Sequence, residues 1–494
     1  MNYTRRALLQ RTIATSAVAN TLFHLRGIGS ALAAGGGPIA GYKGMVCLFL
    51  KGGNDSNNTI IPVTGANRTA YDAGRGSFLA VTAASLAGTT IAPVTYNDGS
   101  TYAFHHKLPK LKQLFTAGDC AVVANVGTLV APMTKTDYQN RSVAVPPQLF
   151  SHSDQQVQWQ SSVPDKPFST GWGGRLGDLL QSWNEDLGAQ ISISMTLAGA
   201  NSYQVGNSSV QYAVTTGGSV SYYGYGNPTG YASAFQAGAT QADMLNPDPS
   251  DYSTSAQGRR MRAFQEIMNA GRTNLLQSAY AATQKRSYEK DILLSSALGG
   301  VTLTTVFPNT GTGQQLAMIA KLIAARNTLC QKRQIFYAEL NGFDTHDNQA
   351  NVNAGGQEPL LTELDDAVKA FHDAMIELGV QNEVCLFTSS DFSRTLTPNK
   401  ADNTAGSDHA WGGQALVIGG AVNGNNIYGT MPNLTVGGPS DVDTSNARGR
   451  YIPTTSVDEF AGTLAKWFGV GSSELATVFP NLSRFPTPDL GFMG

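Results

Sequence analysis

Short apolar runs that end in polar loops recur along this chain of 494 residues and constrain its fold more than any other feature. Residues 334–340 run into the loop Gly342-Phe343-Asp344-Thr345-His346, and residues 44–50 run into a loop that ends at Asp55. Continuous apolar runs of this length are typical of strands buried on both faces. Similar runs, and segments of helical periodicity, alternate along the rest of the chain: 108–115, 120–126, 314–331, 359–378, 383–387, 414–418 and 456–468. This alternation predicts an α/β fold with a mainly parallel sheet covered on both faces.

The composition is that of a globular protein. Hydrophobic residues make up 41% of the chain and charged residues 14%, and the length allows one large domain or two. The formal net charge of −2 argues against nucleic acid as a partner, because binding to phosphates needs a basic excess. Outside the N-terminal segment, no run approaches the length of about 18 apolar residues that a membrane-spanning helix needs. We therefore expect no stable membrane span.

The N-terminal segment has the pattern of an export signal. Arg5 and Arg6 form a twin-arginine pair, and a weakly apolar stretch follows. Ala31-Leu32-Ala33-Ala34 then resembles the small-residue cleavage site of an export signal. Residues 1–34 are therefore predicted to be a twin-arginine export signal, and the mature protein to be periplasmic or secreted. A chance arginine pair before a disordered tail is the alternative.

Residues 40–494 are predicted to form a single domain with one insertion. The insertion, at about 196–256, is rich in Gly, Ser, Tyr and Asn and has no helical period. It is interpreted as an elaborated loop or small β insertion near the rim of the active site, with a disordered linker as the alternative.

Carboxylates and imidazoles follow or precede several of the predicted strands. Ligands in open parallel sheets bind at the carboxyl ends of the strands, so we expect these side chains to meet there. Oxygen ligands suit Ca²⁺, Mg²⁺ or Mn²⁺, while imidazole adds affinity for Zn²⁺ or Mn²⁺. An Asp after a strand can instead be a helix cap or a turn residue. The pattern predicts a site for a divalent metal with these candidate ligands: Asp55, Asp344, His346, Asp391 and His409.

Two more residues are candidates for catalysis. Ser151 precedes a predicted helix, where free N–H groups attract anions, so it could be a nucleophile; it could equally be a plain N-cap. Arg394 could clamp an anionic oxygen of a substrate or tie down its own loop.

The chain resembles an exported bacterial family catalogued as domain of unknown function 1501, which is similar to the alkaline phosphatase and sulfatase superfamily. The resemblance spans essentially the whole mature chain and rests on motifs in this order: Leu50–Asp55, Ser151–His152, Gly342–His346, Ser390–Thr395, Asp408–Gly413 and Ile427–Gly429. It implies a three-layer α/β/α sandwich with a metal site at the carboxyl ends of the strands. Carried over by position, Ser151 stands where that superfamily has its nucleophile.

The chain also departs from the superfamily pattern. Only Thr345 separates Asp344 from His346, and Phe392 stands where a His commonly follows the later Asp. A second metal position is therefore short of a ligand, unless Asn54 or Asp408 substitutes. One metal ion is easier to accommodate than two.

Two functions are compatible with these observations. The first is an exported, metal-dependent hydrolase that acts on small phosphate or sulfate esters. The second is a non-catalytic periplasmic or cell-surface protein for binding or assembly, built on the same fold. The sequence does not identify a protein partner.

Overall fold

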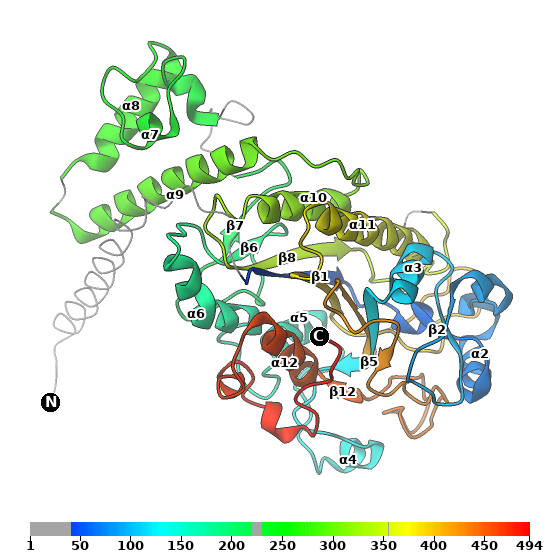
Figure 1. The fold of residues 1–494 in the computed structure, drawn as a ribbon. Helices are drawn as coiled ribbons and strands as arrows, with labels where there is room; N and C mark the ends of the chain where they lie inside the picture. Colours follow the sequence, from blue (N-terminus) through cyan, green and yellow to red (C-terminus); the bar gives the residue numbers. More distant parts are fainter. Residues whose placement is uncertain (1–40, 220–229, 272, 354) are drawn as a thin grey trace, which may run out of the picture.

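A large sheet runs through the body of the protein (Figure 1). The computed structural model describes residues 41–219, 230–271, 273–353 and 355–494, so the predicted export signal lies outside the described residues. The three middle strands β9 (Val384–Ser390), β1 (Lys43–Lys51) and β8 (Arg333–Asn341) are adjacent and parallel. They form the part of the sheet that positions the candidate site.

The remaining strands extend the sheet on both sides. Its order is β11-β5-β10-β9-β1-β8-β6-β7, with β12 paired to β5. β10 is antiparallel to both of its neighbours, and the other pairs are parallel. The bounds of these strands are β5 (Cys120–Gly127), β6 (Ser194–Thr196), β7 (Tyr212–Ala213), β10 (Gly413–Ile418), β11 (Ile427–Tyr428) and β12 (Thr455–Ser456).

Helices cover both faces of this sheet, because alternate residues of each strand point to opposite sides. Met45, Cys47 and Phe49 belong to one hydrophobic core, and Val46 and Leu48 belong to the other. The first core is covered by α5 (His152–Ser161), α6 (Trp172–Glu185) and α12 (Val457–Phe468). The second is covered by α3 (Pro109–Ala117), α10 (Gly311–Ala324) and α11 (Gln357–Glu377). The predicted α/β/α sandwich is confirmed.

Local signals at the helix ends match the expected helices, with one difference. Ser456 and Glu459 form a reciprocal capping box at the start of α12, and Gly469 closes its end with a left-handed conformation. The helix expected over 314–331 begins earlier and ends at Ala324. The residues that follow form turns, closed by a hydrogen bond from Gln331 N–H to the Arg326 carbonyl at 2.9 Å, before β8 begins.

A small antiparallel sheet, which the sequence pattern did not predict, lies beside the large one. It consists of β2 (Ile60–Pro62), β4 (Tyr102–Phe104) and β3 (Thr90–Ile91). Helix α2 (Gly65–Leu79) shares a hydrophobic core with it that includes Tyr71 and Ile61.

The segment predicted as an insertion, about 196–256, begins in the large sheet and is followed by two further helices. Thr196 ends β6 within the large sheet, and Tyr203 is buried against Trp172. Residues 220–229 lie outside the described part of the chain. Beyond them, α7 (Gln241–Leu245) joins α8 (Ala256–Asn269) and α9 (Leu275–Gly299) in a separate small core. Figure 1 shows these helices at the β7 side of the sheet, away from the carboxyl end of β8. The predicted location of residues 196–256 near the rim of the active site stays a prediction.

Among the described residues, no helix is both long and apolar enough to cross a membrane.

The loop after β1 is anchored by a buried ion pair rather than by a ligand. Asp55 caps the short 3-10 helix η1 (Ser56–Asn58) and accepts hydrogen bonds from the Arg75 guanidinium at 2.5 and 2.6 Å. Neither side chain is exposed. Gln349 also donates to the same carboxylate. In this structure the carboxylate of Asp55, a predicted metal ligand, joins the first loop to α2.

We expect Asp55→Ala to lower the free energy of unfolding by about 3–5 kcal/mol, because it leaves the Arg75 charge buried without a partner. Equilibrium urea unfolding measures this loss. The matched control is Asp72→Ala, which removes the partner of Arg68 on the same helix, where the Asp72 side chain is 50% exposed. It should cost less than about 1 kcal/mol. A variant Asp55→Ala that unfolds normally but loses bound metal would restore Asp55 as a ligand.

Candidate functional site

Polar loops from neighbouring strands meet at one edge of the sheet. Asp344 and His346 follow β8, and Asp391 follows β9, the strands that pair with β1 on either side. His409 precedes β10, which is antiparallel and therefore starts at this same edge. His152 comes from the first residue of α5. The topology thus brings four of the predicted residues to one place, together with a histidine that was not predicted.

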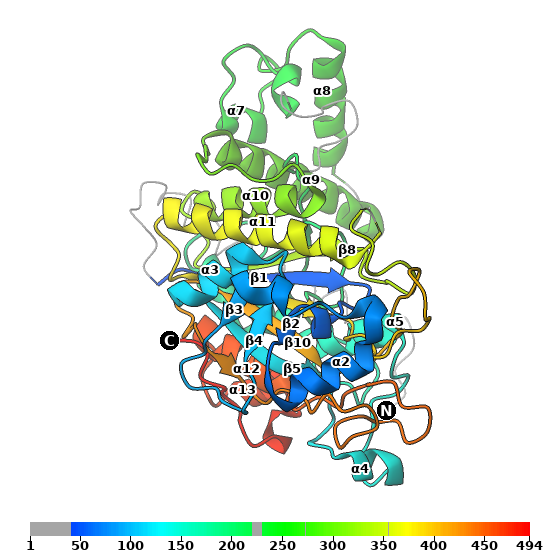
Figure 2. The same cartoon turned by 90° about the vertical axis from the view of Figure 1, so that its right-hand side faces the viewer.

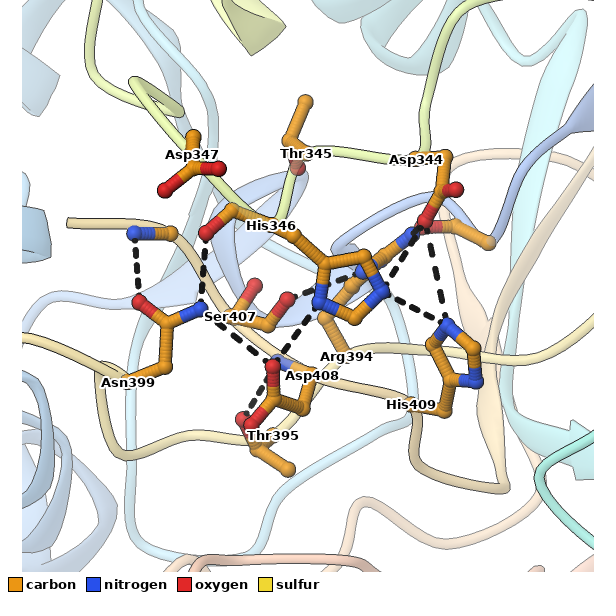
Figure 3. Close-up of polar contacts among 12 residues, drawn as sticks. Asp344, Thr345, His346, Asp347, Arg394, Thr395, Asn399, Ser407, Asp408 and His409 are labelled. Atoms are coloured by element: carbon orange, nitrogen blue, oxygen red, sulfur yellow. Dashed lines mark hydrogen bonds and ion pairs between the residues drawn. The ribbon is translucent and has the colours of Figure 1, made fainter. Parts of the chain in front are cut away.

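Three imidazoles converge on one carboxylate oxygen. The Nε2 atoms of His346, His152 and His409 lie 3.2, 3.4 and 3.8 Å from Oδ1 of Asp344. The Nε2 atoms of His346 and His409 are 2.8 Å apart. Figure 3 shows the His346 ring reaching toward Asp344, with His409 beside it. We call His152, Asp344, His346 and His409 the histidine cluster.

The other ring nitrogen of each histidine is held by an acceptor. Nδ1 of His152 lies 2.6 Å from Oδ2 of Asp391, and Nδ1 of His346 lies 2.8 Å from Oδ1 of Asp408. Nδ1 of His409 lies 2.6 Å from the Phe150 carbonyl oxygen. Carboxylate and carbonyl oxygens only accept, so each Nδ1 carries a proton and donates it. In a neutral ring, Nε2 then presents a lone pair to the centre of the cluster.

The Nε2 lone pairs of the three histidines and the Asp344 carboxylate are all electron-rich and face one another. A cation placed between them would relieve this repulsion. Nε2 of His152 is buried without a hydrogen-bond partner. The ligand atoms of His152, Asp344 and His409 all lie within 4.8 Å of one another. Ligand atoms around a tetrahedral zinc ion, at about 2.0–2.2 Å from the metal, lie roughly 3.3 Å apart. The three imidazoles lie 3.2–3.8 Å from Oδ1 of Asp344, which is close to that spacing. The donor set fits a divalent cation, and its oriented histidines are typical of metal sites.

The electrostatics agree with this arrangement. Burial favours a higher pKa for Asp344, but the Arg394 guanidinium outweighs it and holds that pKa below its usual value. For Asp408 burial is likewise outweighed, by hydrogen bonds from Arg448, His346 and Asn399, which lower the pKa to about 2. The hydrogen bond to Asp391 raises the pKa of His152, whereas burial lowers that of His409. The carboxylates are thus ionised at neutral pH.

Tight packing holds the imidazoles in place. The Phe392 ring lies 4.7 Å from the rings of both His152 and His409. The Phe392 side chain therefore packs against two histidines of the cluster and helps to orient their rings. Gly53, at φ +82°, lies so close that an added Cβ would be 2.4 Å from the Phe392 ring. Phe150 adopts φ +71°, a conformation that costs a bulky residue energy, and directs its carbonyl to His409.

Arg394 is fully buried and ties loops together. Its Nε donates to the Gly53 carbonyl at 2.9 Å, and its Nη1 donates to the Ser407 carbonyl at 2.8 Å. Its Nη2 donates to the Gly52 carbonyl and to Asp344. Of the two roles considered from sequence, the structure shows the second, because these donors are used within the protein.

Ser151 occupies the N-cap position of α5, but its side chain does not cap the helix. Its hydroxyl donates to Oδ2 of Asp154 at 2.5 Å and lies 3.2 Å from the Ser153 hydroxyl. The residue directly precedes His152, so its backbone adjoins the histidine cluster.

The remaining candidates lie behind the cluster or apart from it. Asp391 is buried, orients His152, and also accepts from Gln156 at 2.9 Å and from Gly52 N–H at 3.2 Å. Asp408 likewise orients His346 rather than supplying a second metal position. Asp55 is taken up by Arg75, as described above. Sequence reasoning missed His152, although its motif with Ser151 was a usable signal.

A second group of potential ligands consists of His105, His106 and Glu358. His106 Nε2 lies 3.0 Å from Oε1 of Glu358, and the Lys107 ammonium lies 3.5 Å from the other oxygen. His105 Nδ1 accepts from Lys107 N–H at 3.2 Å, and His106 Nδ1 is buried with no partner. Without oriented imidazoles, and with a lysine already present, this group is best described as an ion pair that joins the β4 loop to α11.

Comparison with known proteins identifies a family but no activity. No curated protein matches the chain. Among solved structures it is similar to the PsFucS1 sulfatase from Pseudoalteromonas sp., at 10% identity over 84% of this chain and 69% of that chain, with a TM-score of 0.30. A likeness this distant does not bear on activity. A family model described as a protein of unknown function (DUF1501) matches residues 42–474. Because that match covers most of the sequence, the chain belongs to the DUF1501 family.

Proposed function

We propose that this protein is an exported, metal-dependent hydrolase of small phosphate or sulfate esters. The observation that supports the proposal is the histidine cluster, in which three imidazoles with fixed tautomers and one carboxylate face a common centre. When bound, a divalent cation supplies Lewis-acid polarisation of an ester oxygen. The exposed fraction of the Asp344 side chain, 52%, leaves the centre open to small substrates.

The ligand types narrow the choice of cation. Ca²⁺ and Mg²⁺ prefer oxygen ligands, whereas imidazole suits Zn²⁺ and other transition metals. Of the four cations considered from sequence, three histidines and one aspartate favour Zn²⁺, followed by Mn²⁺. One ion is expected, because Asp55, Asp391 and Asp408 are engaged elsewhere.

The protein's own residues have distinct roles in this proposal. His152, His346, His409 and Asp344 hold the cation, and Arg394 fixes Asp344. Ser151 is the proposed nucleophile, because its hydroxyl already donates to Asp154, which can receive the proton. Its Oγ would bond to the phosphorus or sulfur of the ester while the bond to the alcohol oxygen breaks and the alcohol leaves, and water would then release the phosphate or sulfate from Ser151. Free N–H groups in the first turn of α5 would attract the anionic group of the substrate.

The proposed location and substrate class rest on the sequence. The twin-arginine pattern supports export to the periplasm or the medium. The net charge of −2 gives no support for nucleic acid as a substrate.

A binding or assembly protein with a structural metal is the second candidate. The helical pair α8–α9, which exposes Leu275 and Leu276, favours it, because hydrolysis of a small ester does not require such a surface. In that case, removing the metal would lower the stability of the protein, and no ester would be turned over by the loaded protein.

We expect His346→Ala and His409→Ala to abolish stoichiometric metal binding, since each removes one of four converging ligands. Elemental analysis of the purified protein, with calorimetric titration of Zn²⁺ and Mn²⁺, measures this. His106→Ala is the control, because His106 lies in the other group of potential ligands. Retention of metal by both cluster variants would contradict the assigned site.

Asp391→Asn should weaken metal affinity by about 10–100-fold without abolishing binding, because residues that orient a ligand contribute on that scale. The same titration applied to Asp344→Asn should show a larger loss. If Asp391→Asn is as damaging as Asp344→Asn, then Asp391 binds the metal directly and the described arrangement changes on loading.

Ser151→Ala should reduce turnover of aryl phosphate or aryl sulfate esters by about a thousandfold or more, as removal of a nucleophile does in other hydrolases. Metal content should not change. Ser153→Ala, which removes the neighbouring hydroxyl, is the matched control. Full turnover by Ser151→Ala would exclude it as the nucleophile, and absence of turnover in the loaded wild type would favour the second candidate.

A further inference from the structure

A helical hairpin stands off the body of the protein. Helices α8 and α9 are joined by residues 270–274 and share a small core with α7, which includes Met261, Tyr288 and Ile292. Figures 1 and 2 both show α7 and α8 outside the layered body, whereas Leu294 and Ala297, near the end of α9, belong to the core that α10 and α11 cover. The end of the hairpin therefore projects where another surface could meet it.

The first turns of α9 expose large apolar side chains. Leu275 is 62% exposed, Leu276 is 82% exposed and Tyr280 is 64% exposed. They lie within six residues at the start of the helix, which is the projecting end of the hairpin. Exposed apolar side chains that gather in this way mark surfaces for protein or membrane binding.

The charge of the hairpin favours a membrane surface over a protein as the partner. Residues 256–299 contain seven Lys and Arg against three Asp and Glu, although the whole chain has a net charge of −2. Apolar side chains beside a basic excess are typical of helices that lie on anionic bilayers, and tyrosine favours the interface between lipid and water. A stable protein interface buries about 800 Å² on each partner, which is more than three side chains at a helix end offer.

We propose that the end of the α8–α9 hairpin docks on an anionic lipid surface. Leu275, Leu276 and Tyr280 enter the interfacial region, while the basic side chains of the hairpin interact with the headgroups. This contact is peripheral and does not depend on the ester hydrolysis proposed above.

Cosedimentation of the purified protein with phosphatidylcholine vesicles, with and without phosphatidylglycerol, tests the proposal. We expect binding to the anionic vesicles alone, and a loss of binding at about 1 M salt, where the Debye length falls to about 3 Å. The double variant Leu275→Ser, Leu276→Ser should bind about tenfold more weakly or worse, because it removes apolar area that enters the bilayer. Lys285→Gln should weaken binding at low salt, because the Lys285 ammonium lies 3.0 Å from Oδ1 of Asn269 at the docking end of the hairpin.

The matched control is the double variant Val94→Ser, Val306→Ser, which removes side chains that are 70% and 88% exposed but lie outside the hairpin. It should bind as the wild type does. Circular dichroism should show that all the variants fold, since none of the replaced side chains is buried. Equal binding by the Leu275→Ser, Leu276→Ser variant would overturn the proposal. So would wild-type protein that ignores anionic vesicles but forms dimers which this variant cannot form.

Discussion

The candidate site depends on one buried guanidinium, that of Arg394. A charge that is fully removed from water is costly unless its hydrogen bonds are made within the protein. Arg394 makes them to the carbonyls of Gly52, Gly53 and Ser407 and to the carboxylate of Asp344. A single cation thus connects the loops after β1 and β8 with the loop before β10. Asp344, the carboxylate on which three histidines converge, is held where this cation requires it.

The same network explains why glycines follow β1. At Gly52, which has φ +110°, an added Cβ would lie 2.5 Å from the Asp344 backbone nitrogen. Glycines let the backbone approach another group closely. Here the close approach is to the neighbouring loop, and it carries the Gly52 and Gly53 carbonyls to Arg394. The loop therefore contributes to the site by positioning Asp344.

The fold could be predicted from the sequence because buried parallel strands leave a strong periodic signal. The runs at 44–50, 334–340 and 383–387 became β1, β8 and β9, and the structure places these strands side by side and parallel. Individual roles could not be predicted in the same way. An aspartate after a strand has the same local pattern whether it binds a metal or, as Asp55 does, pairs with Arg75 twenty residues later. That distinction depends on a helix whose position the sequence did not give.

His152 and Asp391 also show that a local sequence pattern does not reveal the role of a residue. A histidine at the first residue of a short helix carries no periodic signal, and nothing local indicates that its ring reaches a carboxylate 239 residues away. Once the two are in contact, their roles are linked, because Asp391 fixes the tautomer that lets His152 present a lone pair to the cluster. The sequence pattern identified Asp391 as a candidate but missed His152, whose imidazole lies between Asp391 and the centre of the histidine cluster.

The histidine cluster and the α8–α9 hairpin lie in different parts of the protein, so one surface would not contact both. The cluster lies at the carboxyl ends of β1, β8 and β9, whereas α8 and α9 lie on the β7 side of the sheet, away from the carboxyl end of β8 (Figure 1). A surface that met the end of the hairpin would therefore not cover Asp344 or His346, whose side chains are 52% and 39% exposed. Because the two are separated, a change at the hairpin should leave the tautomers and spacing of the cluster unaltered. The proposed surface binding and the proposed metal binding can consequently be tested independently of each other.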